Sequence, residues 1–337
     1  MEESKTTLTF VDLFSGIGGF HLGIEQAAKD FGLDARCELA VDINEKARKT
    51  YTTNFPGTRL LNDVTDDSVK NSIPEDVDII CGGFPCQPFS LAGKKLGIAD
   101  HRGTLFIHII DILRRKRPKV VFLENVRNLL KIQNDDGTYA IDTILAALES
   151  AGYPVQGTVD GIEWKNYRVY RATDFGLPTH RPRVYFVGFR SDLAQGQRKF
   201  QMPEPSSISP ATLAKYFRTL SKDWDQKVLR YGWPKRVGAT LRVGGVGSGY
   251  RQNLTIRDRR NWDSYILYEN NEKRRKHHKI TVTEAKAMMG FPVDFKFPEQ
   301  ISDPQAMKQL GNSVAVPVIK AVADSIIRTL YGGSDNS

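Results

Sequence analysis

One cysteine of this chain stands where a thiol could meet a ligand. Cys86 lies in the run Gly82-Gly83-Phe84-Pro85-Cys86-Gln87-Pro88-Phe89-Ser90. The glycines permit unusual dihedral angles and close approach, while the prolines stiffen the loop, so the sulfur is presented and not buried. A thiol with a pKa of about 8.5 needs a nearby positive charge to attack at neutral pH. We therefore predict that Cys86 is a nucleophile, whereas Cys37 and Cys81 fit the ordinary alternative of small buried core residues.

Two other groups could act beside this thiol. Glu124 and Asn125 follow the apolar run Val120–Leu123, at a strand end that faces the same rim as Cys86. A buried glutamate has a raised pKa and can hold or donate a proton at pH 7; the alternative is a glutamate that begins a helix. Arg181 and Arg183 enter a later strand, and alternate strand residues point the same way, so both could face one ligand. The alternative for them is a pair of surface arginines.

A glycine turn forms a third constellation. Phe14-Ser15-Gly16-Ile17-Gly18-Gly19 follows a short apolar strand, and its glycines let the backbone approach a ligand at a helix N-terminus. Asp42 ends the next strand and could accept two hydroxyl hydrogen bonds from a ribose. Asp63, after Leu60-Leu61-Asn62, is placed to meet an adenine amino group. Many nucleotide-binding enzymes share this pattern, and a merely structural tight turn is the alternative.

The elements that must position these residues alternate between strands and helices. Apolar strands are predicted at Leu8–Leu13, Cys37–Val41, Val77–Cys81, Lys119–Leu123 and Val184–Phe189. An amphipathic helix over Phe20–Ala28 follows the first. This alternation predicts an α/β fold with a doubly wound, mostly parallel sheet. In such sheets ligands bind beyond the carboxyl ends of the strands, where every motif above lies.

The amino-acid composition of the chain changes near Ser191. Residues 191–280 contain 19 Lys and Arg against 8 Asp and Glu, whereas the rest of the chain has 29 against 31. A concentrated basic surface suits a polyanion such as nucleic acid, although a solvated basic face with no partner is the alternative. We predict a catalytic domain over residues 1–190, completed by residues 302–337. A smaller, irregular, basic domain is predicted over residues 191–301.

Two helices are predicted in the C-terminal part. One covers Thr283–Met289, with Thr281 or Thr283 as its N-cap, and the last covers Val314–Tyr331.

Composition excludes several classes of protein. The 337 residues are 40% hydrophobic and 26% charged, with a net charge of +9, as in a soluble globular protein. No apolar run approaches the roughly 18 residues of a membrane span, and the N-terminus lacks the pattern of a secretory signal. Three cysteines form neither a disulfide framework nor a metal-type cluster. We therefore expect a cytoplasmic protein with no membrane partner and no metal.

Taken together, these motifs resemble a known family. The glycine turn, Gly83-Phe84-Pro85-Cys86-Gln87, Glu124-Asn125-Val126, Arg181-x-Arg183 and Gly311-Asn312-Ser313-Val314 occur in the order seen in DNA cytosine-C5 methyltransferases. The likeness spans about Phe10 to Ile327, apart from the basic middle segment. It implies the class I fold of methyltransferases that use S-adenosylmethionine, with the basic segment as a target-recognition domain.

The resemblance also implies roles. Cys86 would attack C6 of a cytosine flipped out of the duplex, and Glu124 would bond or protonate N3, so that C5 accepts the methyl group. Arg181 and Arg183 would steady the flipped nucleotide. The cofactor would be held by Phe14, Ser15, Gly16, Ile17, Gly18, Asp42, Ile43, Asp63, Val64, Leu105, Asn312 and Ser313.

Partners follow from the same likeness. Double-stranded DNA would be contacted through Thr240, Arg242, Arg251, Arg257, Arg259 and Arg260, by phosphate or guanine-edge hydrogen bonds. The compact size resembles a prokaryotic restriction-modification enzyme, monomeric and genetically paired with a restriction endonuclease.

Three alternatives remain. A tRNA methyltransferase of the same structural family would carry a Cys-Phe-Thr signature, but no cysteine follows Cys86. A catalytically dead DNA-binding relative is disfavoured by the intact Cys86 and Glu124. An amino-methyltransferase would have an Asn/Asp-Pro-Pro-aromatic motif where this chain has Phe84-Pro85-Cys86-Gln87.

Overall fold

The computed structural model describes residues 6–85, 105–134, 137–159, 161–193, 199–206, 253–256, 265–266, 278–279 and 281–332. The chain divides into two compact units. The first contains Met1–Tyr170, Pro182–Glu204 and Val318–Ser337, and the second contains Arg171–Arg181 and Pro205–Pro317. The catalytic and recognition roles given above to residues 1–190, 191–301 and 302–337 remain predictions.

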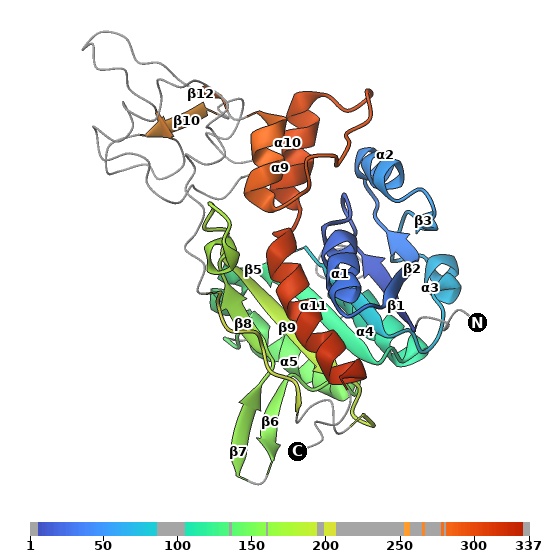
Figure 1. Ribbon diagram of the computed structural model, residues 1–337. Coiled ribbons are helices and arrows are strands. Elements are labelled where there is room, and N and C mark those ends of the chain that lie inside the picture. The colour runs from blue at the N-terminus through green and yellow to red at the C-terminus, as the bar shows by residue number, and fades with distance from the viewer. Residues whose placement is uncertain are drawn as a thin grey trace. The chain divides into compact units, whose positions relative to one another are not determined.

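A seven-stranded sheet forms the centre of the first unit (Figure 1). In sheet order its strands are β3 (Leu60–Leu61), β2 (Asp34–Val41), β1 (Thr7–Leu13), β4 (Ile79–Gly83), β5 (Val120–Val126), β9 (Arg183–Phe189) and β8 (Tyr167–Tyr170). The first five run parallel, whereas β9 and β8 are antiparallel to their neighbours. The predicted mostly parallel α/β sheet is thus confirmed.

The strand that contains Glu124 extends further toward its carboxyl end than predicted. β5 continues through Val126, because its backbone pairs with β9 as far as Val126 opposite Arg183. Glu124 and Asn125 therefore lie within the strand and not after its end, so the predicted boundary at Leu123 was wrong.

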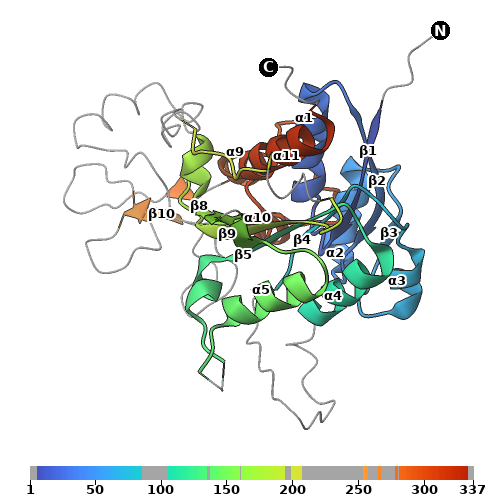
Figure 2. The same cartoon turned by 90° about the horizontal axis from the view of Figure 1, so that it is seen from below.

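Helices cover both faces of the sheet, as Figure 2 shows. Their bounds are α1 (Gly19–Asp30), α2 (Glu45–Asn54), α3 (Asp67–Ser72), α4 (Leu105–Lys116), α5 (Ala140–Ser150) and α11 (Val316–Tyr331). Val11 and Leu13 of β1 share a buried cluster with α3, α4 and α5. Phe10 lies on the opposite face, where the centroid of its ring is 5.1 Å from the centroid of the His21 ring of α1. The alternation of side chains along a strand thus gives the sheet two buried faces.

The contact between α1 and α11 is close. A side chain on Gly23 would place its Cβ 2.7 Å from Cγ2 of Ile319, so only glycine fits there. The part of α11 from Val318 onward belongs to the first unit.

Smaller elements complete this unit. A short 3-10 helix, η1 (Arg127–Lys131), follows β5, and β6 (Gln156–Val159) pairs with β7 (Ile162–Lys165) in a separate hairpin.

The described parts of the second unit are two helices, α9 (Val282–Met289) and α10 (Asp303–Asn312), a 3-10 helix, η2 (Ala172–Phe175), and short strands. Thr281 caps α9, accepting a hydrogen bond from the Glu284 N–H at 3.2 Å, while the Glu284 carboxylate accepts from the Thr281 N–H. This capping box decides between the two predicted caps. The strands β10 (Asn253–Ile256), β11 (Tyr265–Ile266) and β12 (His278–Lys279) form a small antiparallel sheet.

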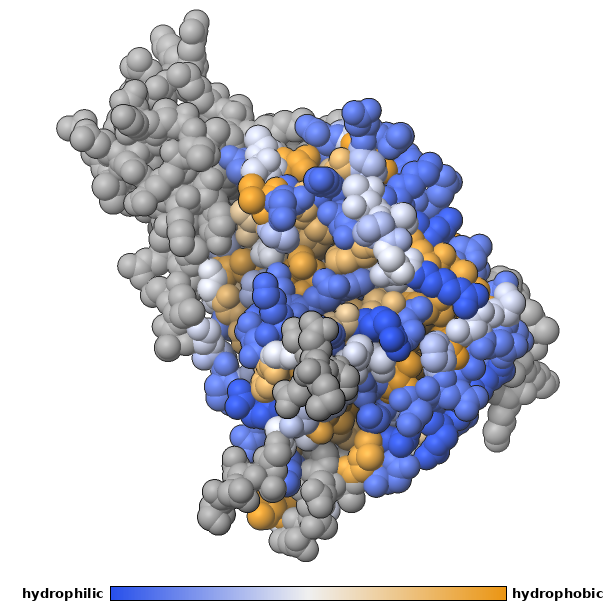
Figure 3. Space-filling view, turned by 45° about the vertical axis from the view of Figure 1, so that its right-hand side comes forward, coloured by the Kyte–Doolittle hydropathy of each residue, from blue (hydrophilic) through white to orange (hydrophobic). Residues whose placement is uncertain are grey.

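One helical stretch, Asp303–Tyr331, has the length and composition of a membrane span. The stretch is mostly buried, as the core helix of a soluble protein also is, and the helical backbone is interrupted at residues 313–315. The face drawn in Figure 3 is largely hydrophilic, with smaller groups of hydrophobic residues among the polar ones.

Candidate active site

The glycine turn after β1 forms where it was predicted and begins α1. Phe14, Gly16 and Gly18 all have positive φ, at 56°, 56° and 87°. The Ser15 N–H donates to the Val41 carbonyl at 2.9 Å, which joins the turn to β2. A Cβ on Gly18 would lie 2.3 Å from Phe55, whereas one on Gly16 would meet nothing within 4 Å. Gly18 is therefore required by packing, and Gly16 leaves open space beside the backbone.

Asp42 closes the turn from the neighbouring strand. Its Oδ2 accepts the Gly16 N–H at 2.7 Å, and its Oδ1 accepts the Asn44 N–H at 2.7 Å. Burial raises the pKa of this carboxyl, while those two N–H groups and the charge of Arg48 act in the opposite direction. A carboxylate has about four lone-pair positions, so each oxygen can still accept a further donor. Ile43, the next residue, is 74% exposed.

The predicted adenine contacts lie after β3. The Asp63 Oδ1 accepts both the N–H and the hydroxyl of Thr65, at 2.9 and 2.8 Å. Val64 is buried in the core with α3 and α4. Because the Val64 side chain is buried, only its backbone groups could contact a ligand. Leu105 begins α4 and packs, half-buried, against the same cluster.

A buried ion pair joins β5 to β9. The Arg183 Nε lies 2.9 Å from the Glu124 Oε1, and the two side chains are 14% and 10% exposed. Asn125 donates from its Nδ2 to the Phe84 carbonyl at 3.0 Å, which ties β5 to the residue that follows β4. A guanidinium held against a mostly buried carboxylate fixes the orientation of that carboxylate.

The register brings Glu124 near the cysteine loop. Gly83, the last residue of β4, is the partner of Glu124 across the parallel pair, and Cys86 follows three residues later. Three residues span at most about 10 Å of extended chain. Cys86 itself lies outside the described residues, as do Thr240, Arg242, Arg251, Arg257, Arg259 and Arg260. Their roles remain predictions.

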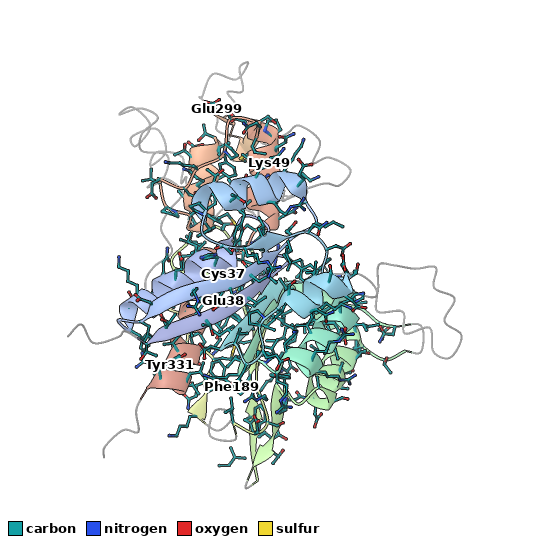
Figure 4. All side chains as sticks on the ribbon, turned by 90° about the vertical axis from the view of Figure 1, so that its right-hand side faces the viewer. Cys37, Glu38, Lys49, Phe189, Glu299 and Tyr331 are labelled. Atoms are coloured by element: carbon teal, nitrogen blue, oxygen red, sulfur yellow. The ribbon has the colours of Figure 1, made fainter. Side chains whose placement is uncertain are left out.

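Cys37 and Cys81 are buried core thiols, as predicted. Cys81 is fully buried, with its Sγ 3.4 Å from the Val11 carbonyl, and burial raises its pKa well above the ordinary range. Cys37, seen on β2 in Figure 4, also has a pKa raised by burial. Neither thiol is suited to form a thiolate at neutral pH.

Arg181 lies outside the strand that contains Arg183. Its backbone has a positive φ of 25°, and β9 begins only at Arg183, so strand alternation does not relate the two side chains. The Arg181 guanidinium is buried and donates to the carbonyls of Gly311, at 3.0 Å, and Ser313. Arg181 thus fixes the backbone around Asn312, the exposed last residue of α10.

The motif reasoning missed two residues. Asp12, on β1, is fully buried, and its Oδ2 has no hydrogen-bond partner among the described residues. An acidic residue inside an apolar strand was a readable signal. Arg48, whose guanidinium donates to the Asp42 carbonyl at 2.7 Å, lies in the first turns of α2. Nothing in its sequence context marks it. Within the described part of the chain, no cluster of His, Cys, Asp and Glu could hold a metal ion.

Comparisons with known proteins agree with this arrangement. The family described as C-5 cytosine-specific DNA methylase matches residues 8–328. The type II methyltransferase M.NlaX of Neisseria lactamica is 39% identical over 335 residues, covering 96% of this chain and 98% of the relative. The type II methyltransferase M1.ScrFI of Lactococcus lactis subsp. cremoris is 37% identical over 339 residues, covering 97% and 80%.

Solved structures share the fold. The Dnmt2 methyltransferase of S. pombe superposes with a TM-score of 0.67 at 19% identity, covering 96% of this chain and 99% of that one. A DNMT2 mutant of Spodoptera frugiperda gives a TM-score of 0.64 at 22% identity, covering 95% and 99%.

Proposed function

This chain belongs to the C-5 cytosine-specific DNA methylase family, and on that basis we propose that it methylates C5 of a cytosine flipped out of duplex DNA. The enzyme class is given by the family match and by relatives that are type II methyltransferases of restriction-modification systems: it is a DNA cytosine-C5 methyltransferase. The cofactor, the catalytic residues and the mode of access to the base are the proposal.

The proposed cofactor is S-adenosylmethionine, and the residues after β1 and β2 fit it. Gly16 leaves open space beside the turn, and Asp42 can still accept hydroxyl donors. When bound, the cofactor supplies an electrophilic methyl group on a sulfonium. Phe14 would stack on the adenine, and Asp63 and the Val64 backbone would meet its edge.

The proposed nucleophile is Cys86. Its thiolate would form a bond to C6 of the cytosine and push electron density to C5. C5 would then take the methyl group from the bound cofactor, which would leave as S-adenosylhomocysteine. A base then removes the proton from C5, and the bond between sulfur and C6 breaks to restore the thiolate and the aromatic ring. Because C6 lies inside the base stack, this attack requires the cytosine to be flipped out.

Glu124 and Arg183 would act on the opposite edge of the ring. Glu124 hydrogen-bonds or protonates N3, which stabilises the negative charge that attack at C6 develops in the ring. Arg183 keeps that carboxylate oriented through their 2.9 Å contact. The proposal depends on this ion pair, because Glu124 lies directly opposite Gly83, three residues before Cys86. Arg181, by contrast, acts through the backbone of residues 311–313, where Asn312 and Ser313 are proposed cofactor contacts.

Duplex DNA is the proposed substrate, read by the basic segment of residues 191–280. A monomeric, cytoplasmic enzyme, paired genetically with a restriction endonuclease, would fit relatives named as type II methyltransferases. Such a methyltransferase would protect the DNA that the endonuclease cleaves.

Covalent trapping tests this proposal. We expect the wild-type protein to crosslink to DNA containing 5-fluorocytosine when S-adenosylmethionine is present, because fluorine cannot leave C5 as a proton does. Cys86→Ala should abolish both crosslinking and methyl transfer. Cys81→Ala, which removes a buried thiol only five residues away, should keep both.

Bisulfite sequencing of DNA from cells that express the protein identifies the modified atom and its sequence context. Methyl transfer that survives in Cys86→Ala, or methylation of tRNA in place of DNA, would contradict the proposal.

A further inference from the structure

Arg48 holds the turn that follows β2. Its Nη1 donates to the Asp42 carbonyl at 2.7 Å, and its own N–H donates to the Asn44 carbonyl at 2.9 Å. The Asn44 side chain accepts the Ala47 N–H at 3.1 Å and so caps α2. Hydrogen bonds from α2 therefore restrain the backbone of residues 42–44, in addition to their covalent connection to β2.

The same turn carries the Asp42 carboxylate. Each of its oxygens already accepts one backbone N–H, from Gly16 of the glycine turn and from Asn44. These two bonds fix the plane of the carboxylate, and its remaining lone pairs fix where a hydroxyl donor can lie. A shift of the Asp42 backbone would move the carboxylate and break its bond to Gly16.

Charge adds a second argument. Asp42 is half-buried, and its charge contributes to raising the pKa of the buried Asp12 carboxyl on β1. Burial raises the pKa of Asp42, and the N–H groups of Asn44 and Gly16, followed by the charge of Arg48, lower it. Arg48 is thus the positive side chain that favours an ionised Asp42.

We propose that Arg48 is a positioning residue for cofactor binding, which holds the Asp42 carboxylate in the geometry that accepts the hydroxyl groups of the cofactor ribose. This role rests on the proposed function, in which Asp42 binds that ribose. Arg48 itself need not touch the cofactor.

The test replaces Arg48 by methionine, which keeps the length of the side chain and removes its charge and donors. Calorimetric titration with S-adenosylhomocysteine should give an affinity roughly tenfold below that of the wild type, as expected for the loss of one charge-assisted hydrogen bond. Arg48→Lys should recover part of this loss.

The matched control is Lys46→Met on the same helix. It removes an exposed positive charge whose side chain, unlike that of Arg48, makes no contact with Asp42 among the described residues. Lys46 lies on α2, the helix on which Figure 4 labels Lys49. We expect Lys46→Met to bind S-adenosylhomocysteine with the affinity of the wild type.

Two readouts separate positioning from a general loss of structure. First, analogues of S-adenosylhomocysteine that lack the 2′- or 3′-hydroxyl should bind the wild type and Arg48→Met with nearly equal affinity. Second, without Arg48 the pKa of Asp42 rises further, so the loss of cofactor affinity at acid pH should begin at a higher pH than in the wild type.

Equal affinity of the wild type and Arg48→Met for S-adenosylhomocysteine would overturn the role of Arg48. An equal loss for the hydroxyl-free analogues would overturn it too, because the effect would then not pass through the ribose. A wild type that does not distinguish the natural ligand from the hydroxyl-free analogues would instead overturn the proposed ribose contact of Asp42.

Discussion

At the scale of single residues, the ion pair of Glu124 and Arg183 contributes more to orientation than to stability. Both side chains are largely buried, and removing two charges from water costs several kcal/mol, which their attraction offsets only when the geometry is good. Such a pair stabilises a fold little compared with well-packed apolar residues. It does fix the orientation of the carboxylate whose residue pairs with Gly83, as the proposed proton transfer to a ring nitrogen would require.

The buried Asp12 has a consequence for stability that depends on pH. Burial, followed by the nearby charge of Asp42, raises its pKa well above the ordinary value. The unfolded chain therefore ionises Asp12 more readily than the folded protein does, and stability is lost as pH rises above the unfolded pKa of about 3.9.

We expect Asp12→Asn to be more stable than the wild type at pH 7, with the difference shrinking as pH falls toward 4. Urea unfolding without cofactor, over a pH series, measures this difference. Asp63→Asn, at a half-exposed carboxyl, is the control for the removal of one negative charge. A gain that stays constant with pH would show that the titration of Asp12 is not its source.

At the scale of elements, the turn between β1 and α1 requires glycine at two positions for different reasons, one of them local and one of them packing. Gly16 and Gly18 both adopt positive φ, which a residue with a side chain reaches only at a cost. At Gly18 the Phe55 ring of the segment after α2 also fills the space where a Cβ would lie. The positive φ belongs to the turn, whereas the close contact belongs to the packing of α1 against its neighbours.

These two glycines should therefore respond differently to alanine. Gly18→Ala should destabilise the protein by about 2–4 kcal/mol, from strained backbone and overpacking together. Gly16→Ala should cost only about 1–2 kcal/mol, from the backbone alone. Urea unfolding without cofactor measures both, and equal losses would contradict the role given to Phe55.

At the scale of the whole molecule, charge is divided unevenly along the chain. The positive excess lies within residues 191–280, while the rest of the sequence is close to neutral. Each phosphate that a protein neutralises releases counterions, so the logarithm of DNA affinity falls with the logarithm of salt concentration with a slope of about −0.9 per contact.

DNA affinity should accordingly fall steeply with salt, by at least about a thousandfold between 50 and 200 mM if six or more phosphates are contacted. Affinity for S-adenosylhomocysteine should change little over the same series, which makes it the internal control. Fluorescence anisotropy with a labelled duplex measures the first, and calorimetry the second. A flat salt series would count against residues 191–280 as the DNA-binding surface.

The amino-acid sequence by itself determined the fold class, five of the seven strands of the central sheet and the helix that follows the first of them. Buried parallel strands read as short apolar runs, and glycine turns and polar residues mark their carboxyl ends, so periodicity and motif order are sufficient. The same local rules identified Cys37 and Cys81 as core thiols, because each lies in an apolar strand. They limited the cap of α9 to Thr281 or Thr283.

Only the tertiary structure decided which of these groups meet. The pairing of β5 with β9 extends β5 past Glu124 and brings Arg183 to it, 59 positions along the chain. Arg181 binds backbone carbonyls 130 and 132 positions away and so does not share the surroundings that strand alternation predicted. Asp12 also acquires its role only through Asp42, which the neighbouring strand β2 brings close to it. Sequence patterns reflect local backbone preference, whereas these contacts depend on register and packing between distant segments, which no local pattern encodes.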